Sequence, residues 1–212
     1  MKIIMFGPPG VGKGTIAARL KEDLDVPHIS TGSMIRDAIQ SSSELGKEAG
    51  QYVQRGDLVP DNLMIEIVKS RLEDDDCKKG YILDGFPRTI KQAEALQAQG
   101  IVIEKVVNLT ADDDTLITRI SSRRECSSCS ANYNLLFVKP HTQDICDRCG
   151  ASLIQREDDK PGSVKNRLEI YRQKTSPLIG FYKEKGLLID VDASVNDPSE
   201  VYDKVVSALD IS

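Results

Sequence analysis

A glycine-rich loop directly after the first apolar run constrains the fold of this chain more than any other feature. The run Lys2–Phe6 predicts a buried parallel strand, and the segment Gly12–Leu24 predicts a helix after the loop. In such a unit, glycines let backbone N–H groups surround phosphate oxygens, and the helix N-terminus adds partial positive charge. The loop GPPGVGKGT fits the pattern G-x-x-x-x-G-K-[ST] through Lys13, although Gly14 stands where Ser or Thr is usual. It therefore predicts a nucleoside triphosphate site and does not identify the acceptor.

Strands alternate with helices along most of the chain, which is typical of a parallel sheet covered by helices on both faces. Further strands are expected at 26–29, 81–83, 105–109, 133–138 and 187–191. Helices are expected at 33–40, 45–54, 61–72, 90–99, 112–123, 161–185 and 198–209. Asp61 is expected to cap the helix that it begins, and Pro177 to bend the long one. The pattern predicts an α/β fold.

Composition excludes several classes of protein. With 40% hydrophobic residues among 212, the chain can form one sizeable core. No apolar run approaches the roughly 18 residues of a membrane-spanning helix. The first residues lack the pattern of a secretion signal, so we expect a cytoplasmic protein. A formal net charge of −5 argues against a general nucleic-acid binder.

Four of the five cysteines form two Cys-x-x-Cys pairs, Cys126 with Cys129 and Cys146 with Cys149, separated by 16 residues. This spacing indicates zinc, and four thiolates leave no position for a catalytic water, so the site would be structural. The segment has few apolar residues, so metal binding would supply its missing folding free energy. Two disulfides, an iron–sulfur cluster and unliganded thiols stay open as alternatives. Ser130 replaces the glycine that often follows such a pair, which predicts a slightly strained turn.

Five motifs resemble those of the adenylate kinase family in order and spacing, over nearly the whole chain. They are GPPGVGKGT at 7–15, STGSMIR at 30–36, GDLVPD at 56–61, LDGFPRT at 83–89 with Gln92 following, and QREDD at 155–159. The resemblance implies reversible, Mg²⁺-dependent phosphoryl transfer from ATP to AMP, giving two ADP, in adenine nucleotide homeostasis. It also implies a monomer without nucleic-acid or membrane partners.

The resemblance further implies a P-loop three-layer fold with a parallel central sheet and three parts. Residues 1–29, 60–121 and 160–212 would form the core. Residues 30–59 would form a helical segment that closes over AMP, and residues 122–159 a small β-rich, zinc-binding lid that closes over ATP. Closure would expel water and strengthen the contacts between arginines and phosphates.

Positions that match the family's motifs supply the expected site residues. Catalysis would depend on Lys13, Arg88, Arg123, Arg156 and Arg167. ATP would contact Gly10, Val11, Gly12, Lys13, Gly14, Thr15, Arg119, Arg123, Asn132, Tyr133 and Val195. AMP would contact Thr31, Gly32, Arg36, Asp57, Leu58, Val59, Gly85, Arg88, Gln92, Arg156 and Arg167.

These residue types suit phosphoryl transfer, in which the protein positions the reactants and stabilises charge. The planar fork of an arginine makes two hydrogen bonds to phosphate oxygens. Asp84 would hold Mg²⁺ through water, since this ion keeps several waters and binds few carboxylates directly. Ser33 departs from the Asp that the family often has near the same ion, and we expect a modest effect.

Two other functions share some of these features. A kinase for uridylate or cytidylate would have the same fold and arginines, but the amide of Gln92 matches the donor–acceptor edge of adenine. A zinc-ribbon module that binds nucleic acid or protein would use the two Cys-x-x-Cys pairs. Yet the chain is acidic, and its insert offers only Tyr133 and Phe137 for stacking.

Overall fold

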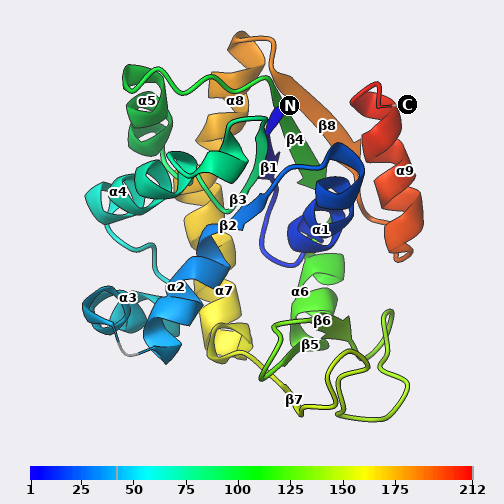
Figure 1. Ribbon diagram of the computed structural model, residues 1–212. Helices are drawn as coiled ribbons and strands as arrows, with labels where there is room; N and C mark the ends of the chain where they lie inside the picture. The colour runs from blue at the N-terminus through cyan, green and yellow to red at the C-terminus, as the bar shows by residue number, and fades with distance from the viewer. Residues whose placement is uncertain (42, 212) are drawn as a thin grey trace.

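A parallel sheet of five strands forms the centre of the computed structural model, which describes residues 1–41 and 43–211 (Figure 1). Its order is β2-β3-β1-β4-β8, with bounds β1 Lys2–Phe6, β2 His28–Ser30, β3 Tyr81–Asp84, β4 Lys105–Thr110 and β8 Leu188–Asp192. Because these strands run parallel, their carboxyl ends meet at one edge, where ligands bind in folds of this kind. The predicted α/β fold is confirmed.

The central strand β1 separates two apolar layers. Ile3 and Met5 face one layer, and Ile4 and Phe6 face the other, because successive side chains of a strand point to opposite faces. The first layer is covered by α1 Lys13–Leu24, α6 Asp113–Ser121, α7 Pro161–Ile170 and α9 Pro198–Ala208. The second is covered by α4 Asp61–Leu72, α5 Ile90–Ala98 and α8 Pro177–Glu184. The sheet is thus held rigidly between helices on both faces.

Two helices, α2 Thr31–Gln40 and α3 Glu44–Arg55, form a hairpin below β2 in Figure 1. The side chains of Ser30 and Ser43 cap their N-termini by accepting hydrogen bonds from backbone N–H groups. The two helices approach closely at Gly46, where an added Cβ would lie 2.0 Å from the carbonyl oxygen of Ala38. This contact admits only glycine.

The chain after α6 forms a separate antiparallel sheet of order β6-β5-β7, at the lower right of Figure 1. The bounds are β5 Arg123–Cys126, β6 Asn132–Asn134 and β7 Leu153–Ile154. Its apolar cluster consists of Cys126, Ala131, Tyr133, Cys146 and Leu153, with Ala151 packed against it. So small a core indicates that the cysteines carry part of the stability. Ser130 has a φ of +56°, which confirms the strained turn.

The small sheet is fastened to the end of α6. Asn134 Nδ2 donates to the carbonyl oxygen of Arg119 over 3.1 Å, and the backbone N–H of Leu135 donates to the carbonyl oxygen of Ser122 over 2.9 Å. Carbonyls in the last turn of a helix have no partner within the helix. The small sheet therefore supplies hydrogen bonds that α6 cannot make for itself.

Several predicted element boundaries were wrong. The helix expected at 112–123 ends at Ser121, so Arg123 opens β5. The strand expected at 133–138 is limited to Asn132–Asn134, with an isolated bridge from Asn134 to Val138. The helix expected at 161–185 is divided by a π-helical turn, Tyr171–Thr175. Pro177 explains this division, because it has no N–H with which to continue the helical hydrogen bonds.

Asp61 does not cap α4 as expected. The residue before the helix is Pro60, and no side chain caps this end. The carboxylate of Asp61 instead accepts hydrogen bonds from Thr89 and Gln92, both on or beside α5. Asp61 therefore links two helices.

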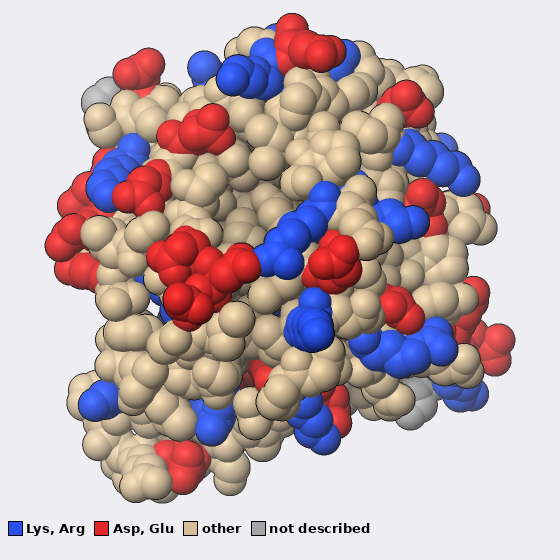
Figure 2. All heavy atoms as spheres, turned by 180° about the vertical axis from the view of Figure 1, so that it is seen from behind, with Lys and Arg blue, Asp and Glu red and all other residues tan. Residues whose placement is uncertain are grey.

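Among the described residues, no helix is long and apolar enough to cross a membrane. On the face turned away from the viewer of Figure 1, basic and acidic side chains are interspersed (Figure 2). That face has no broad basic area of the kind that binds nucleic acid.

Replacing Gly46 by alanine is expected to destabilise the protein by about 1–3 kcal/mol, because the new methyl group would overlap the carbonyl of Ala38. Gly180 in α8 is the matched control, since no atom lies within 4 Å of its added Cβ. Gly180→Ala should stabilise the protein by roughly 0.5–1 kcal/mol. Urea unfolding of both variants tests this, and equal stabilities would contradict the described contact between α2 and α3.

Candidate active site and metal centre

The phosphate loop joins β1 to α1 at the carboxyl edge of the sheet. Gly7 has a φ of +134°, and its added Cβ would lie 2.4 Å from the carbonyl oxygen of Leu109, so the loop passes very close to β4. Lys13 Nζ donates to the carbonyl oxygens of Gly7 over 2.8 Å and Pro8 over 2.9 Å. The loop therefore curls around the lysine and the N-terminus of α1. It contains the predicted ATP contacts Gly10, Val11, Gly12, Lys13, Gly14 and Thr15.

Asp84 ends β3 beside this loop. Its Oδ2 lies 3.2 Å from His28 Nε2 on the neighbouring strand β2. Burial opposes the negative charge, but the hydrogen bond from His28 and the charge of Lys13 hold the pKa of Asp84 below its usual value. Burial also lowers the pKa of Lys13 to about 7, although Asp84 opposes this change. A lysine so perturbed is typical of a functional site.

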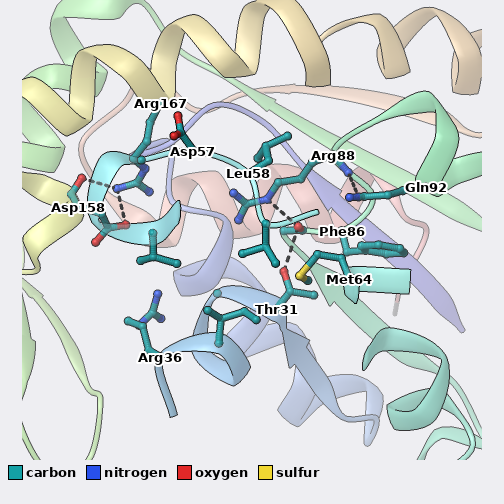
Figure 3. Close-up of a pocket in the computed structure, with 16 residues that line it drawn as sticks. Thr31, Arg36, Asp57, Leu58, Met64, Phe86, Arg88, Gln92, Asp158 and Arg167 are labelled. Carbon is teal, nitrogen blue, oxygen red and sulfur yellow. Dashed lines mark hydrogen bonds and ion pairs between the residues drawn. The ribbon is translucent and has the colours of Figure 1, made fainter. Parts of the chain in front are cut away.

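A second pocket lies beside the loop (Figure 3). Ten of the eleven residues predicted to contact AMP line it: Thr31, Gly32, Arg36, Asp57, Leu58, Val59, Gly85, Arg88, Gln92 and Arg167. The side chains of Arg36, Arg88 and Arg167 point toward one another, while Met64 and Phe86 lie at the other end. A pocket with cations at one end and apolar side chains at the other suits a nucleoside monophosphate.

Arg88 and Gln92 are held by a network of hydrogen bonds. Arg88 Nε donates to the carbonyl oxygen of Gly85 over 2.7 Å, and Thr175 Oγ1 donates to the carbonyl oxygen of Arg88 over 3.0 Å. Gln92 accepts from the backbone N–H of Arg88 over 2.6 Å and donates to Asp61 over 2.8 Å. Each end of this amide keeps one further hydrogen-bonding position, which could serve a nucleobase.

The arginines nearest the small sheet are paired with carboxylates. Arg123 Nε donates to Asp159 Oδ2 over 2.7 Å, and Arg167 Nη1 lies 3.0 Å from Asp159 Oδ1 and 2.8 Å from Asp158 Oδ2. Arg156 pairs with Glu125. Asp159 is only 1% exposed, and buried carboxylates persist in proteins when they are paired in this way.

Four predicted ATP contacts occupy less direct positions. Arg119 donates to the carbonyl oxygens of Ala193 over 2.8 Å and Val195 over 2.6 Å, so this carbonyl of Val195 already has one donor. Asn132 is exposed and accepts a hydrogen bond from Arg156. Tyr133 is buried, and its hydroxyl accepts from the backbone N–H of Asp147. The side chain of Tyr133 thus points into the small sheet, and a contact with ATP would fall to its backbone.

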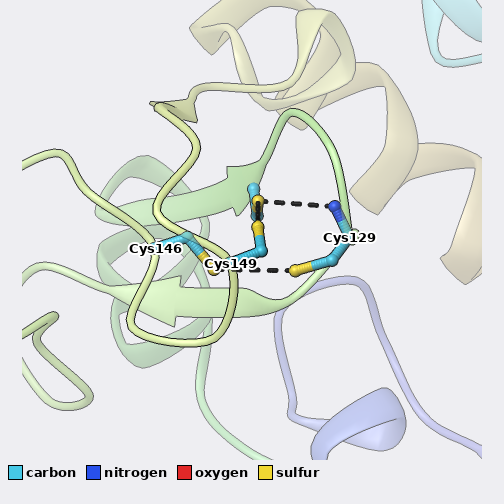
Figure 4. Close-up of side chains that lie close together, drawn as sticks. Cys129, Cys146 and Cys149 are labelled. Atoms are coloured by element: carbon cyan, nitrogen blue, oxygen red, sulfur yellow. Dashed lines mark hydrogen bonds between the residues drawn. The ribbon is translucent and has the colours of Figure 1, made fainter.

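The four cysteines meet at one point (Figure 4). Their sulfurs all lie within 4.8 Å of one another, with 3.4 Å between Cys126 and Cys149 and 3.5 Å between Cys129 and Cys146. All four are free cysteines, so the disulfide alternative is wrong. Sulfurs bound tetrahedrally to one zinc ion stand about 3.8 Å apart. The donor set therefore fits a single metal ion.

Some residues of the site were not predicted. His28, Asp61, Glu125 and Thr175 each contact a predicted residue through side chains or carbonyls distant in sequence. Only His28 carries a local signal, since it precedes the motif at 30–36 on a strand that leads to the same edge as Asp84. The others required the three-dimensional contacts.

A phosphate loop, a second pocket suited to an anion and converging arginines on a parallel sheet define a P-loop phosphotransferase. Comparison with known proteins identifies the family. Residues 5–187 match the family model described as adenylate kinase. The chain belongs to the adenylate kinase family.

Curated relatives agree with this family. An adenylate kinase of Methanocella arvoryzae is 50% identical over 196 residues, which cover 91% of each chain. One of Caldicellulosiruptor saccharolyticus is 50% identical over 193 residues, covering 89% of this chain and 90% of the relative. One of Thermoanaerobacter sp. is 44% identical over 213 residues, covering 99% and 98%.

The lowered pKa of Lys13 predicts that binding of ATP takes up protons. With a pKa of about 7, Lys13 is mostly neutral at pH 8.5 in the free protein, and bound phosphate would raise the pKa and recharge it. Affinity for Mg²⁺-free ATP should therefore fall between pH 7 and 9. Calorimetry at pH 8.5 in two buffers of different ionisation enthalpy measures the uptake. Lys21→Met, an exposed change on α1, should keep it. Equal heats in both buffers would contradict the prediction.

Proposed function

We propose that this chain catalyses the reversible reaction ATP + AMP = 2 ADP, with Mg²⁺, and so maintains adenine nucleotide balance. One observation carries the proposal. Arg123 of the small sheet and Arg167 of the second pocket pair with the same carboxylate, Asp159, and Arg88 lines that pocket beside Arg167. Burial and these three arginines lower the pKa of Lys13, against the opposing charge of Asp84. Cations from the phosphate loop, the second pocket and the small sheet therefore act on one point. Two nucleotides bound in the two pockets would meet there with their phosphates.

In the proposed reaction, the protein aligns the two nucleotides and neutralises charge on the transferring group. Lys13 would contact the β- and γ-phosphates of ATP. Arg36 and Arg88 would hold the phosphate of AMP, while Arg123, Arg156 and Arg167 would surround the transferring group. The attacking oxygen of AMP is already an anion at neutral pH, so no general base is required.

The carboxylate of Asp84 suits a hydrated magnesium ion. It lies at the carboxyl end of β3, beside the phosphate loop, and its pKa is below the usual value, so it carries a charge at neutral pH. Mg²⁺ bound with ATP would neutralise charge on the phosphates. Ser33 Oγ accepts a hydrogen bond from Arg36 over 3.0 Å, so this side chain helps to orient the guanidinium group of Arg36.

Adenine as the acceptor base is supported by Gln92. This side chain is 2% exposed and lines the second pocket, with one donor and one acceptor position still available. Both positions together match the donor–acceptor edge of adenine.

We also propose the three moving parts: a core of 1–29, 60–121 and 160–212, an AMP segment 30–59, and a lid 122–159. The separate sheet and apolar cluster of the lid support this division. The lid would be held by zinc, bound by Cys126, Cys129, Cys146 and Cys149. We further propose a cytoplasmic monomer that binds no nucleic acid, in keeping with the net charge of −5.

A coupled assay tests the activity. Purified protein with Mg²⁺ and ATP is given AMP, uridylate, cytidylate or guanylate in turn, and formation of ADP is followed. AMP should be strongly preferred. The absence of ADP with AMP, or a preference for a pyrimidine monophosphate, would overturn the proposal.

Removing a cation from the cleft should abolish most of the activity. Lys13→Met and Arg88→Ala are each expected to lower kcat by about 10²–10³-fold or more, because each removes charge stabilisation in a buried site. Lys21→Met on α1 and Lys91→Ala on α5 are the controls, since both side chains are exposed. Turnover close to the parent in either cleft variant would contradict the assigned roles.

Removing one metal ligand should unfold the lid. Cys129→Ser is expected to lose the zinc ion and lower the thermal midpoint, since metal binding supplies the folding free energy of such segments. Cys77→Ser removes the one cysteine outside the cluster and should keep one zinc per chain. Metal analysis and calorimetric scans on both variants provide the measurements. Iron in place of zinc, or full metal content in Cys129→Ser, would overturn the assignment.

A further inference from the structure

The side-chain amide of Gln92 is held by a different partner at each end. Its Oε1 accepts a hydrogen bond from the backbone N–H of Arg88 over 2.6 Å (Figure 3). Its Nε2 donates to Oδ1 of Asp61, the first residue of α4, over 2.8 Å. Gln92 lines the second pocket, whereas Asp61 is not among the described residues that do so. Any effect of Asp61 on a bound base therefore passes through Gln92.

Thr89 fixes the direction of the contact with Asp61. Its Oγ1 caps α5 by accepting a hydrogen bond from the backbone N–H of Gln92 over 3.2 Å. The hydroxyl has a single proton, which it donates to Asp61 Oδ1 over 3.1 Å. One carboxylate oxygen therefore receives two hydrogen bonds from the start of α5, and these hold the carboxylate against the amide of Gln92.

These partners determine which end of the amide donates. A carboxylate only accepts hydrogen bonds and a backbone N–H only donates them, whereas an amide has one end of each kind. Reversing the amide of Gln92 would set its oxygen against the carboxylate of Asp61 and its NH₂ group against the N–H of Arg88. Gln92 is 2% exposed, and such mismatches cost more in a buried site than in water. The contacts therefore favour a single orientation of this amide.

The orientation of the amide decides which purine edge can pair with it. Adenine accepts a hydrogen bond at its ring nitrogen N1 and donates from its amino group. Hypoxanthine donates at N1 and accepts at its carbonyl oxygen, although its outline is almost the same. A pocket that reads only shape would therefore admit both bases. At one position in the pocket, the amide of Gln92 can pair with adenine in one orientation and with hypoxanthine only in the other.

We propose that Asp61 is a specificity-determining positioning residue. Its carboxylate fixes the NH₂ end of Gln92 and makes the pocket select adenine over bases with the reversed edge, hypoxanthine and guanine. This inference rests on the proposed function for the place of the acceptor base. It assigns part of the selectivity to a residue that would not touch the nucleotide.

Asp61→Asn tests the carboxylate with little change of shape. Asparagine can turn either its oxygen or its NH₂ group toward Gln92, so the reversed amide becomes less costly, although the N–H of Arg88 still opposes it. With AMP and inosine monophosphate as acceptors, the ratio of their kcat/KM values should fall about tenfold, chiefly through a gain with inosine monophosphate. A defect in folding would instead lower both values by the same factor.

Two further variants show whether Asp61 acts through Gln92. Glu66→Gln removes the same charge from an exposed position of α4 and should keep the parent's ratio. Gln92→Met removes the amide, and in that background Asp61→Asn should leave the ratio unchanged, because the two changes affect one contact. An unchanged ratio in Asp61→Asn alone, or a change that persists in the Gln92→Met background, would overturn the proposal.

Calorimetry of nucleotide binding, without Mg²⁺ or turnover, separates this inference from the proposed function. In Asp61→Asn, the preference in Kd for AMP over inosine monophosphate should also fall about tenfold. If the parent forms no ADP from ATP and AMP while this binding preference still falls, the proposed function alone is overturned. If ADP forms and the binding preference stays the same, the role of Asp61 alone is overturned.

Discussion

The accumulation of positive charge in a cleft with little water is the constraint on which the rest of this structure depends. Under the proposed function, Lys13 and the arginines converge on phosphates, yet buried like charges repel one another. Carboxylates among these cations offset the repulsion: Asp84 lies at the loop, and Asp158 and Asp159 lie beside Arg167. Folding and the proposed function are therefore coupled, because the cations that would bind phosphate need anions to stay buried without it.

Much of the fold and site is predictable because it depends on local sequence. A glycine loop between an apolar strand and a helix specifies its own geometry, and ten residues carried over for AMP line one pocket. The predictions that failed depend on distant contacts. Arg123 leaves α6 for β5 because it pairs with strand β6, and Asp61 turns from its helix end toward Gln92. A sequence pattern over a few neighbouring residues does not indicate which distant residues they will contact.

The lid and the core solve the problem of stability differently. The core has two apolar layers on a parallel sheet, whereas the lid has a cluster of only five buried side chains, two of them cysteines. Tyr133 connects these features, because its ring belongs to the apolar cluster and its hydroxyl lies 3.5 Å from the sulfur of Cys146. A segment stabilised at one point can stay rigid inside while it makes few contacts with the core, which suits the movement that we propose for it.

The attachment of Asn134 to the last turn of α6 has a mechanical consequence. If the lid moves as proposed, it must either break its hydrogen bond to the carbonyl of Arg119, which would then face water, or move the end of α6 with it. In the second case the pivot lies inside α6. The side chain of Arg119, which donates hydrogen bonds to the 193–195 turn, would then move that turn as well. Movement of the small sheet would then displace the turn after β8, which is an edge strand of the central sheet.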